Sequence, residues 1–355
     1  MALLATDYII LEDSRRLALR DLPDSVPSSS FMSDRHVAVC RRLASDQELS
    51  EALRPVYLNL LVTQSRRARE LTALATLIDR GELAVRTLVS SVVSDDFVEL
   101  LGGAVAIERR RRSRRPALID RSRALRFVAK GLVHRLYRLV RRRPLTGTAF
   151  VRAWVDTTEL AFGDEVRSAT RLLYPFGGSP GRQLRYALAC KRAGRAFSAM
   201  GIPYRLSDLA GIALRLSERD RRIAGAEHAA FAAHAEELQR AGVGTLFATD
   251  EFDAAAHVLH GALRASGVAC INRAHGIAVY GPHVSYTRFH VLSQRQRAYY
   301  ARYGDVETFA VGSLAADGPT AGATPSGAPV AVFVLGNWRR TGKRYEAHFE
   351  AAMLP

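Results

Sequence analysis

Four short apolar runs, separated by polar or helix-like stretches, dominate the pattern of the chain between residues 242 and 313. Short apolar runs without alternation are typical of strands that are buried on both faces of a parallel sheet. Between the first two runs, apolar residues repeat at helical spacing over 255–262, and Gly267 lies where a left-handed C-cap is expected. The pattern predicts alternating strands and helices, with strands at Val243–Ala248, Val268–Asn272, Phe289–Leu292 and Thr308–Val311.

The residues that directly follow these runs form a candidate binding site. Parallel strands place their carboxyl ends along one edge of the sheet, where the ligands of open α/β sheets bind. We expect that edge to bring together Asp250, Glu251, Arg273, His275, Gly276, Ser293, Gly312 and Ser313.

Among these residues, His275 is the candidate catalytic group. An imidazole titrates near neutral pH, so His275 can act as a general base toward a hydroxyl or steady a phosphate oxygen. Asp250 and Glu251 are candidates for holding sugar or ribose hydroxyls, and Arg273 can offset the charge of a diphosphate. Each has a structural alternative, because Asp250 and Ser293 can cap helices and His275 can fill a strand-to-loop corner.

A strongly basic segment precedes the region of predicted parallel strands. Between Val105 and Leu145 there are fifteen Lys and Arg residues and two acidic ones, a local charge of +13 within a net charge of +16. From Leu118 onward apolar residues recur at helical spacing among the arginines, which predicts a basic amphipathic helix over 105–145. Such a helix suits an anionic membrane surface, and the alternatives are nucleic acid or a solvated helix packed on its own domain. Few aromatic residues lie here, which disfavours binding of single-stranded nucleic acid.

Residues 1–104 and residues 146–312 are expected to fold differently. Residues 1–104 show mostly helical spacing, with one candidate strand at Tyr8–Leu11, and are interpreted as a helical accessory region. Residues 146–312 are expected to form the Rossmann-like domain, with further strands at Phe150–Val155 and Ile202–Leu206.

The last part of the chain changes composition again. Residues 313–328 are rich in Gly, Ala, Ser, Thr and Pro, as in a linker between domains. A new apolar run at Val330–Leu335 then predicts that residues 329–355 begin a second Rossmann-like domain, of which only the start is present.

The composition of the chain is that of a globular protein. The chain has 355 residues, of which 48% are hydrophobic and 24% charged, so it suits one large or two ordinary globular domains. Its three cysteines lie far apart, which favours reduced thiols in a cytoplasmic protein and excludes a CxxC zinc site. Neither a Walker loop nor a Gly-x-Ser-x-Gly elbow occurs, and the histidine spacing indicates no metal site.

The motifs at the ends of the predicted strands follow a recognisable order. An acidic pair, Asp250-Glu251, follows the first strand, and His275-Gly276 follows the second. Phe-His-Val-Leu-Ser at 289–293 and Val-Gly-Ser at 311–313 complete the series. This stretch resembles the first-domain core of GT-B-type transferases, in particular bacterial surface and capsular polysaccharide biosynthesis proteins and CDP-glycerol glycerophosphotransferase-like proteins. The resemblance implies an α/β, GT-B-like fold.

The same resemblance implies an enzyme of cell-surface polysaccharide biosynthesis. Such a glycosyltransferase or glycerophosphotransferase moves a group from a nucleotide-activated donor, its co-substrate, to a carbohydrate or lipid-linked acceptor. It requires no other cofactor and works in the cytoplasm, at the inner face of the plasma membrane. Because the second domain of GT-B enzymes grips the donor and is only begun here, a catalytically incomplete membrane-associated partner or scaffold is the first alternative. A nucleic-acid-binding protein is the second.

Overall fold

The computed structural model divides the chain into two units, Met1–Leu314 and Ala315–Pro355. The second unit lies outside the residues that the structure describes, and so do the expected linker over 313–328 and the expected second-domain start over 329–355. The described residues are 7–22, 34–90, 93–103, 105–110, 118–140, 145, 147–152, 155–175, 180–214, 219–250, 254–274, 284–291, 294–301 and 307–310.

The larger sheet of the first unit has seven strands among the described residues, and all of its strand pairs are parallel. Their order is β11-β10-β9-β8-β5-β6-β7, which is the order of Rossmann folds with one further strand added. The strands are β5 (Ala149–Val151), β6 (Thr170–Leu173), β7 (Phe197–Ala199), β8 (Thr245–Ala248), β9 (Ala269–Arg273), β10 (Arg288–Val291) and β11 (Glu307–Ala310).

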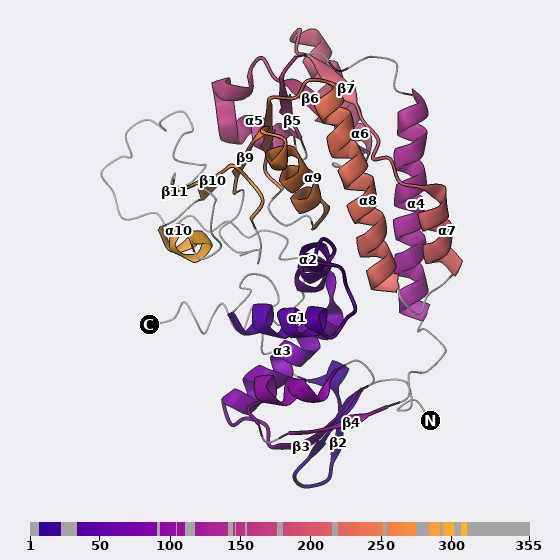
Figure 1. Ribbon diagram of the computed structural model, residues 1–355, viewed down its shortest axis with the longest axis vertical. Helices are drawn as coiled ribbons and strands as arrows, with labels where there is room; N and C mark the ends of the chain where they lie inside the picture. Colours follow the sequence, from indigo (N-terminus) through magenta and orange to yellow (C-terminus); the bar gives the residue numbers. More distant parts are fainter. Residues whose placement is uncertain are drawn as a thin grey trace, which may run out of the picture. The chain divides into compact units, whose positions relative to one another are not determined.

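Helices cover this sheet on both faces, as Figure 1 shows. Successive side chains of a strand point to opposite faces, so Phe150 of β5 packs with α8 and α9 while Val151 packs with α5. Burial on both sides explains why consecutive residues of β5 are apolar. The helices are α5 (Val155–Phe162), α6 (Pro180–Arg192), α7 (Leu206–Leu214), α8 (Arg219–Arg240), α9 (Ala254–Ala265) and α10 (Gln294–Tyr300).

A second, smaller sheet lies in the first 110 residues and has the strand order β2-β1-β3-β4. Strand β1 pairs antiparallel with β2 and β3, whereas β3 and β4 are parallel. Three helices between β2 and β3 supply much of its apolar core, and Ser65 caps the third by accepting a hydrogen bond from the backbone N–H of Ala68 at 3.1 Å. The elements are β1 (Tyr8–Leu11), β2 (Arg16–Ala18), α1 (Asp34–Ser45), α2 (Arg54–Gln64), α3 (Arg66–Asp79), β3 (Val85–Ser90) and β4 (Ala106–Arg109), with 3₁₀ helices at Leu19–Asp21, Asp95–Leu101 and, beside the larger sheet, Gly163–Val166.

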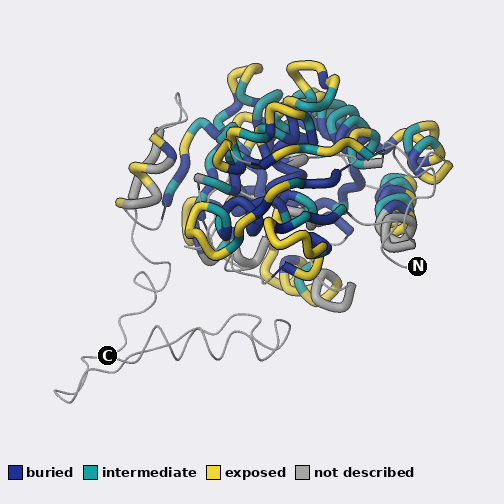
Figure 2. The backbone as a smooth tube through the Cα atoms, turned by 90° about the horizontal axis from the view of Figure 1, so that it is seen from below, coloured by how far each residue is buried: buried dark blue, intermediate teal, exposed yellow. Residues whose placement is uncertain are grey.

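Helix α4 (Leu118–Val140) packs on α7, beside α8 in Figure 1. Gly131 allows the side chain of Leu209 to approach the helix backbone closely. The ring of Phe127 meets that of Tyr204 edge to face, with centroids 5.6 Å apart. His134 accepts a hydrogen bond at Nδ1 from the backbone N–H of Ile202, 3.2 Å away. These contacts bury one side of α4. Figure 2 shows the burial of each described residue along the whole chain.

The structure confirms the strand–helix alternation that the sequence predicts around Gly242–Ser313. Strands β8 to β11 coincide with the four apolar runs to within a few residues and are all parallel. Gly267 has the left-handed φ of 82° expected for the residue after α9. The first unit therefore has a Rossmann-like α/β fold.

Three expectations about individual elements are wrong. Residues 1–104 are not mostly helical: the strand expected at Tyr8–Leu11 is present as β1, but β2 and β3 were not expected, and all three form a sheet with β4. The basic segment 105–145 is not one helix, since its first residues form β4 at the sheet edge, where charged side chains reach solvent easily. Strand β5 ends at Val151 rather than at Val155, which opens α5.

The strand expected at Ile202–Leu206 lies earlier in the chain. Strand β7 occupies Phe197–Ala199, and Leu206 is already the first residue of α7. Ile202 and Tyr204 are buried in the core without belonging to a strand, which explains why their alternating apolar pattern is misleading.

Candidate functional site

The carboxyl ends of β5 and β8 mark the point where the order of the parallel sheet reverses. From β5 the chain adds β6 and β7 on one side, and then crosses to add β8, β9, β10 and β11 on the other. Ligands of open α/β sheets bind outside the strand ends at such a switch point. The residues that follow β5, β6, β8 and β9 are therefore the candidate functional site, called the switch-point site below.

A buried ion pair joins the ends of β5 and β8 in the switch-point site. Arg152 directly follows β5 and Asp250 lies two residues after β8, and the Arg152 guanidinium pairs with the Asp250 carboxylate. Both side chains are buried, so neither charge is compensated by water. The other carboxylate oxygen of Asp250 lies 3.2 Å from Nε2 of His260 on α9. A buried charge must be paired and hydrogen-bonded in this way to be tolerated.

Hydrogen bonds hold the neighbouring strand ends around this pair. The backbone N–H of Arg152 donates to the carbonyl of Phe247 at 2.9 Å, and that of Asp250 donates to Oδ1 of Asn272 at 3.2 Å. The hydroxyls of Thr158 and Thr249 lie 2.9 Å apart, which ties the start of α5 to the end of β8. These contacts link the ends of β5, β8 and β9 and the start of α5.

Asn272 also offers a hydrogen-bond donor that the described residues do not use. Its side chain is fully buried at the end of β9, and Nδ2 has no hydrogen-bond partner among the residues that the structure describes. Leaving a buried donor unpaired costs about 1–3 kcal/mol, so this amide is suited to donate to a ligand or to a neighbouring loop. The residues on either side of the site edge, 251–253 and 275–283, lie outside the described residues.

Aromatic rings flank the Arg152 guanidinium. Its Cζ atom lies 5.7 Å from the ring centroid of Tyr174, the first residue after β6, and 5.4 Å from that of Phe231 on α8. Such contacts stabilise a cation that has been removed from water. They also keep Arg152 at a fixed position between the ends of β5, β6 and β8.

A chain of polar contacts runs from Tyr174 to helix α4. The Tyr174 hydroxyl lies 2.7 Å from Nε2 of His234, whose Nδ1 lies 3.3 Å from Oε2 of Glu237. The Glu237 carboxylate accepts a further hydrogen bond from Arg138 of α4 at 2.8 Å. Because a carboxylate only accepts, Nδ1 of His234 donates to Glu237 and Nε2 accepts from Tyr174.

The pKa shifts along this chain agree with that assignment. Burial lowers the pKa of His234, although its hydrogen bond to Glu237 opposes the change, so the ring is neutral at neutral pH. Burial would raise the pKa of Glu237, but the hydrogen bonds from His234 and Arg138 outweigh it and lower the pKa to about 2. Glu237 is thus ionised and links α8 to Arg138 of α4.

Two histidines of α9 point toward the segment before β10. Nδ1 of His257 and the hydroxyl of Ser285 lie 3.0 Å apart. The ring of His260 meets that of Tyr286 edge to face at 4.8 Å between centroids. His260 therefore supports Asp250 on one side and packs on Tyr286 on the other, which is a positioning role.

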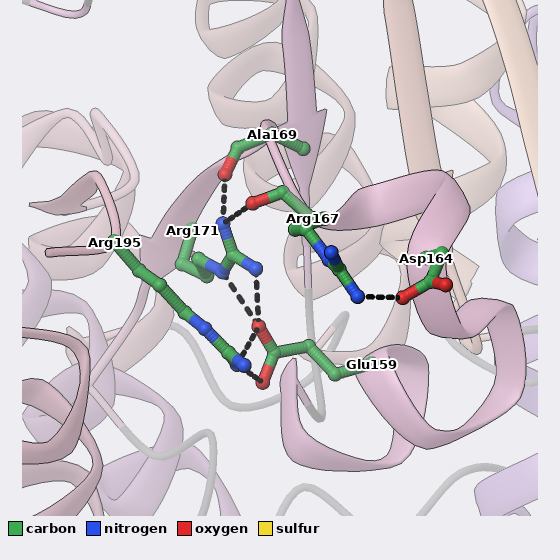
Figure 3. Close-up of polar contacts among 6 residues, drawn as sticks. All are labelled: Glu159, Asp164, Arg167, Ala169, Arg171 and Arg195. Atoms are coloured by element: carbon green, nitrogen blue, oxygen red, sulfur yellow. Dashed lines mark hydrogen bonds and ion pairs between the residues drawn. The ribbon is translucent and has the colours of Figure 1, made fainter. Parts of the chain in front are cut away.

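A second charged cluster surrounds Glu159 and is shown in Figure 3, and of its members Arg171 is buried while Arg195 is exposed. Arg171 binds the Glu159 carboxylate at 2.6 Å, and Arg195 binds both of its oxygens at 3.3 Å. Arg171 also donates to the carbonyl oxygens of Arg167, at 3.1 Å, and Ala169. Since Arg171 and Arg195 lie near the amino ends of β6 and β7, this cluster belongs to the opposite edge of the sheet and fixes α5.

The structure describes two of the residues that the sequence assigns to the site. Asp250 lies at the expected edge, with its carboxylate engaged by Arg152 and His260. Arg273 ends β9, donates to the Ala161 carbonyl of α5, and places its guanidinium 6.0 Å from the ring centroid of Phe162. The remaining predicted site residues lie outside the described residues: Glu251, His275, Gly276, Ser293, Gly312 and Ser313.

Sequence reasoning missed Arg152, Asn272 and Tyr174. The first was placed inside an expected strand over Phe150–Val155, which concealed its position after β5. Asn272 was counted as the last residue of an apolar run. A polar side chain at the end of such a run is the signal that would have identified both.

The described part of the chain has neither a metal-binding cluster nor a helix suited to crossing a membrane. Across the described ranges, no group of three or more His, Cys, Asp or Glu side chains is placed to hold a metal ion. None of the helices in those ranges combines the length and the apolar character that a membrane crossing requires.

The geometry of the site consists of a buried Arg–Asp pair, an available amide donor and hydrogen-bonded strand ends at the switch point of a parallel sheet. No family model, no curated protein and no solved structure matches the chain.

Proposed function

We propose that the chain is a GT-B-like transferase that uses a nucleotide-activated donor at the switch-point site. It moves a glycosyl or glycerophosphoryl group to a hydroxyl of a carbohydrate or lipid-linked acceptor during cell-surface polysaccharide biosynthesis. The observation that carries the proposal is the convergence of Arg152, Tyr174, Asp250 and Asn272 from four adjacent strand ends where the sheet order reverses. Nucleotide-binding parallel sheets hold their ligands at this location.

The proposal assigns a role to each part of the site. His275 follows the last residue of β9 after a single residue in the sequence, and the proposal assigns its imidazole to the same edge. As general base it takes the proton of the acceptor hydroxyl, whose oxygen attacks the transferred group while the nucleotide phosphate leaves. Nδ2 of Asn272 is available to donate to a ligand oxygen. The Arg152–Asp250 pair positions these groups and does not bind the ligand itself.

The test is donor binding and transfer by the full chain. Titration with UDP-, GDP- and CDP-linked donors is expected to give binding to one class, and transfer to follow when an acceptor is supplied. His275→Ala is expected to lower kcat by about 10²–10⁴-fold with donor affinity unchanged, because only proton transfer is removed.

His228→Ala is the matched control, since His228 lies within α8 rather than after a strand of the sheet. The control should transfer like the unchanged chain, and undiminished transfer by His275→Ala would refute the catalytic assignment. Donor binding without transfer to any acceptor would identify a non-catalytic partner instead. Absence of binding to every donor class would refute the transferase proposal as a whole.

A further inference from the structure

Helix α4 carries a row of exposed leucines. Leu125, Leu132, Leu136 and Leu139 expose 61%, 43%, 58% and 82% of their surface. Their spacing at i, i+7, i+11 and i+14 places them on one face of the helix. Single exposed leucines are ordinary, but four along one helix face indicate an interaction surface. These four residues are called the leucine face below.

The leucine face is distinct from the side of α4 that packs on the protein. Ala124 and Gly131 are buried on the opposite side, where the side chain of Leu209 contacts Gly131. His134 and Arg138 anchor the same side through Ile202 and Glu237. The helix is therefore already fixed to its domain, and its core contacts do not explain the leucine face.

The charge around α4 decides what can cover that face. The segment from Val105 to Leu145 has a local charge of +13, fifteen basic residues against two acidic ones. On the helix itself, Arg126 is exposed and Lys130 is partly exposed, and Arg141–Arg143 follow its last residue in sequence. An exposed apolar face with basic neighbours matches a surface that is anionic outside and apolar beneath.

Two other occupants fit this combination less well. A second copy of the chain would bring two segments of +13 together, which like-charge repulsion opposes. Nucleic acid would use the arginines but has no use for four exposed leucines, and among the described residues of α4 the aromatic side chains Phe127 and Tyr137 are both partly buried.

We propose that α4 lies in the interface of a membrane containing anionic phospholipids. The leucine face enters the boundary between headgroups and acyl chains, and the basic residues meet the headgroup phosphates. The helix lies along the surface and does not cross it, in agreement with its many charged residues. This inference goes beyond the transferase chemistry and stands without it.

The experiment is vesicle co-sedimentation of the full chain, with vesicles of phosphatidylcholine alone or mixed with phosphatidylglycerol. The chain is expected to bind the mixed vesicles, and added salt is expected to weaken that binding. Leu132→Gln/Leu136→Gln/Leu139→Gln should weaken binding at least about tenfold, because three apolar side chains no longer leave water. Arg126→Gln/Lys130→Gln should weaken binding by about tenfold and reduce its salt dependence.

The matched control is Leu184→Gln/Leu188→Gln on α6, where the leucines are 63% and 45% exposed but lie on another helix. This variant should bind vesicles like the unchanged chain. The circular dichroism of all variants should match, since every substituted position is solvent-accessible.

Several results would overturn the proposal. Equal binding to neutral vesicles, or full binding by both the leucine and the charge variants, would remove α4 from the interface. A dimer in size-exclusion chromatography that the leucine substitutions convert to a monomer would assign the face to a second copy. Tight, salt-sensitive binding of DNA or RNA that displaces the vesicles and is indifferent to the leucines would assign the segment to nucleic acid.

Discussion

Arg152 and Asp250 compensate each other inside the protein, so the stability of the site depends on both charges being present. Each is buried, and their partners are His260, two aromatic rings and strand-end backbone groups. Removing one member of a buried ion pair leaves the other charge without water or a counter-charge. A substitution of either residue is therefore expected to lower the stability of the protein even when no ligand is bound.

We expect Asp250→Asn to lower the free energy of unfolding by about 3–5 kcal/mol, because the Arg152 guanidinium stays buried without a counter-charge. Urea denaturation at neutral pH measures the change. Asp164→Asn is the control, since its pair with Arg167, drawn in Figure 3, is solvent-exposed and its loss should cost at most about 1 kcal/mol. Equal costs for the two substitutions would contradict the buried-pair interpretation.

At the residue scale, the sequence predicts positions better than contacts. The sequence predicts Asp250 and Arg273 at the sheet edge because each follows an apolar run, and that reasoning is local. The partner of Asp250 comes from β5, about a hundred residues earlier, and no periodicity links two such distant positions. Long-range pairs of this kind follow only from the strand order.

Helix α4 and the segment after β7 approach each other closely at Gly201. Among the described glycines, an added Cβ would come nearest to a neighbouring atom at this position. Gly201 lies where an added Cβ would overlap the carbonyl oxygen of His134 and press on the side chain of Arg138. A backbone carbonyl cannot move aside as a flexible side chain can. The position of α4 therefore depends on the absence of a side chain at residue 201.

We expect Gly201→Ala to lower the free energy of unfolding by about 1–3 kcal/mol, because α4 has to shift away from the sheet. Gly225→Ala on α8 is the matched substitution, since an added Cβ there meets nothing within 4 Å. It should raise stability by about 0.5–1 kcal/mol, as a helix-interior glycine is replaced by a better helix former. Thermal unfolding of the two variants checks the opposite signs, and destabilisation by both would contradict this account.

At the element scale, strands that lie within short apolar runs are the ones that the pattern predicts well. Strands β8, β9, β10 and β11 are short apolar runs between clear boundaries, and all were expected. Strand β4 reads Ala-Ile-Glu-Arg and was hidden in a basic segment, because an edge strand needs little apolar surface. The strand assignment at Ile202–Leu206 failed since burial there comes from packing against α4 and not from a sheet.

On the scale of the whole first unit, two apolar cores meet through the helices. The core around the small sheet includes Ala224 of α8, and Val258 of α9 packs against it. Val258 also packs against the core of the large sheet. The sequence predicted a boundary between an accessory region and a Rossmann-like domain, but it contained no sign that α8 and α9 take part in both cores.

We expect Leu71→Ala and Leu246→Ala to lower the stability of one shared unfolding transition. Leu71 is fully buried in the core of the small sheet and Leu246 in that of the large sheet, so each substitution should cost about 2–5 kcal/mol. Urea unfolding followed by tryptophan fluorescence and by circular dichroism should give coincident transitions for both variants. Two separate transitions, each sensitive to one substitution, would show that the cores unfold independently.

The order in which the strands join the large sheet also bears on how the chain is made. During synthesis β5, β6 and β7 leave the ribosome first, while the neighbour of β5 on its other side, β8, follows only after α7 and α8. Until Thr245–Ala248 emerges, the backbone donors and acceptors along that side of β5 have no strand to bond with. An open edge of this kind invites pairing with other chains. The nascent protein thus depends on rapid docking of β8, or on a chaperone that shields Phe150 and Val151 in the meantime.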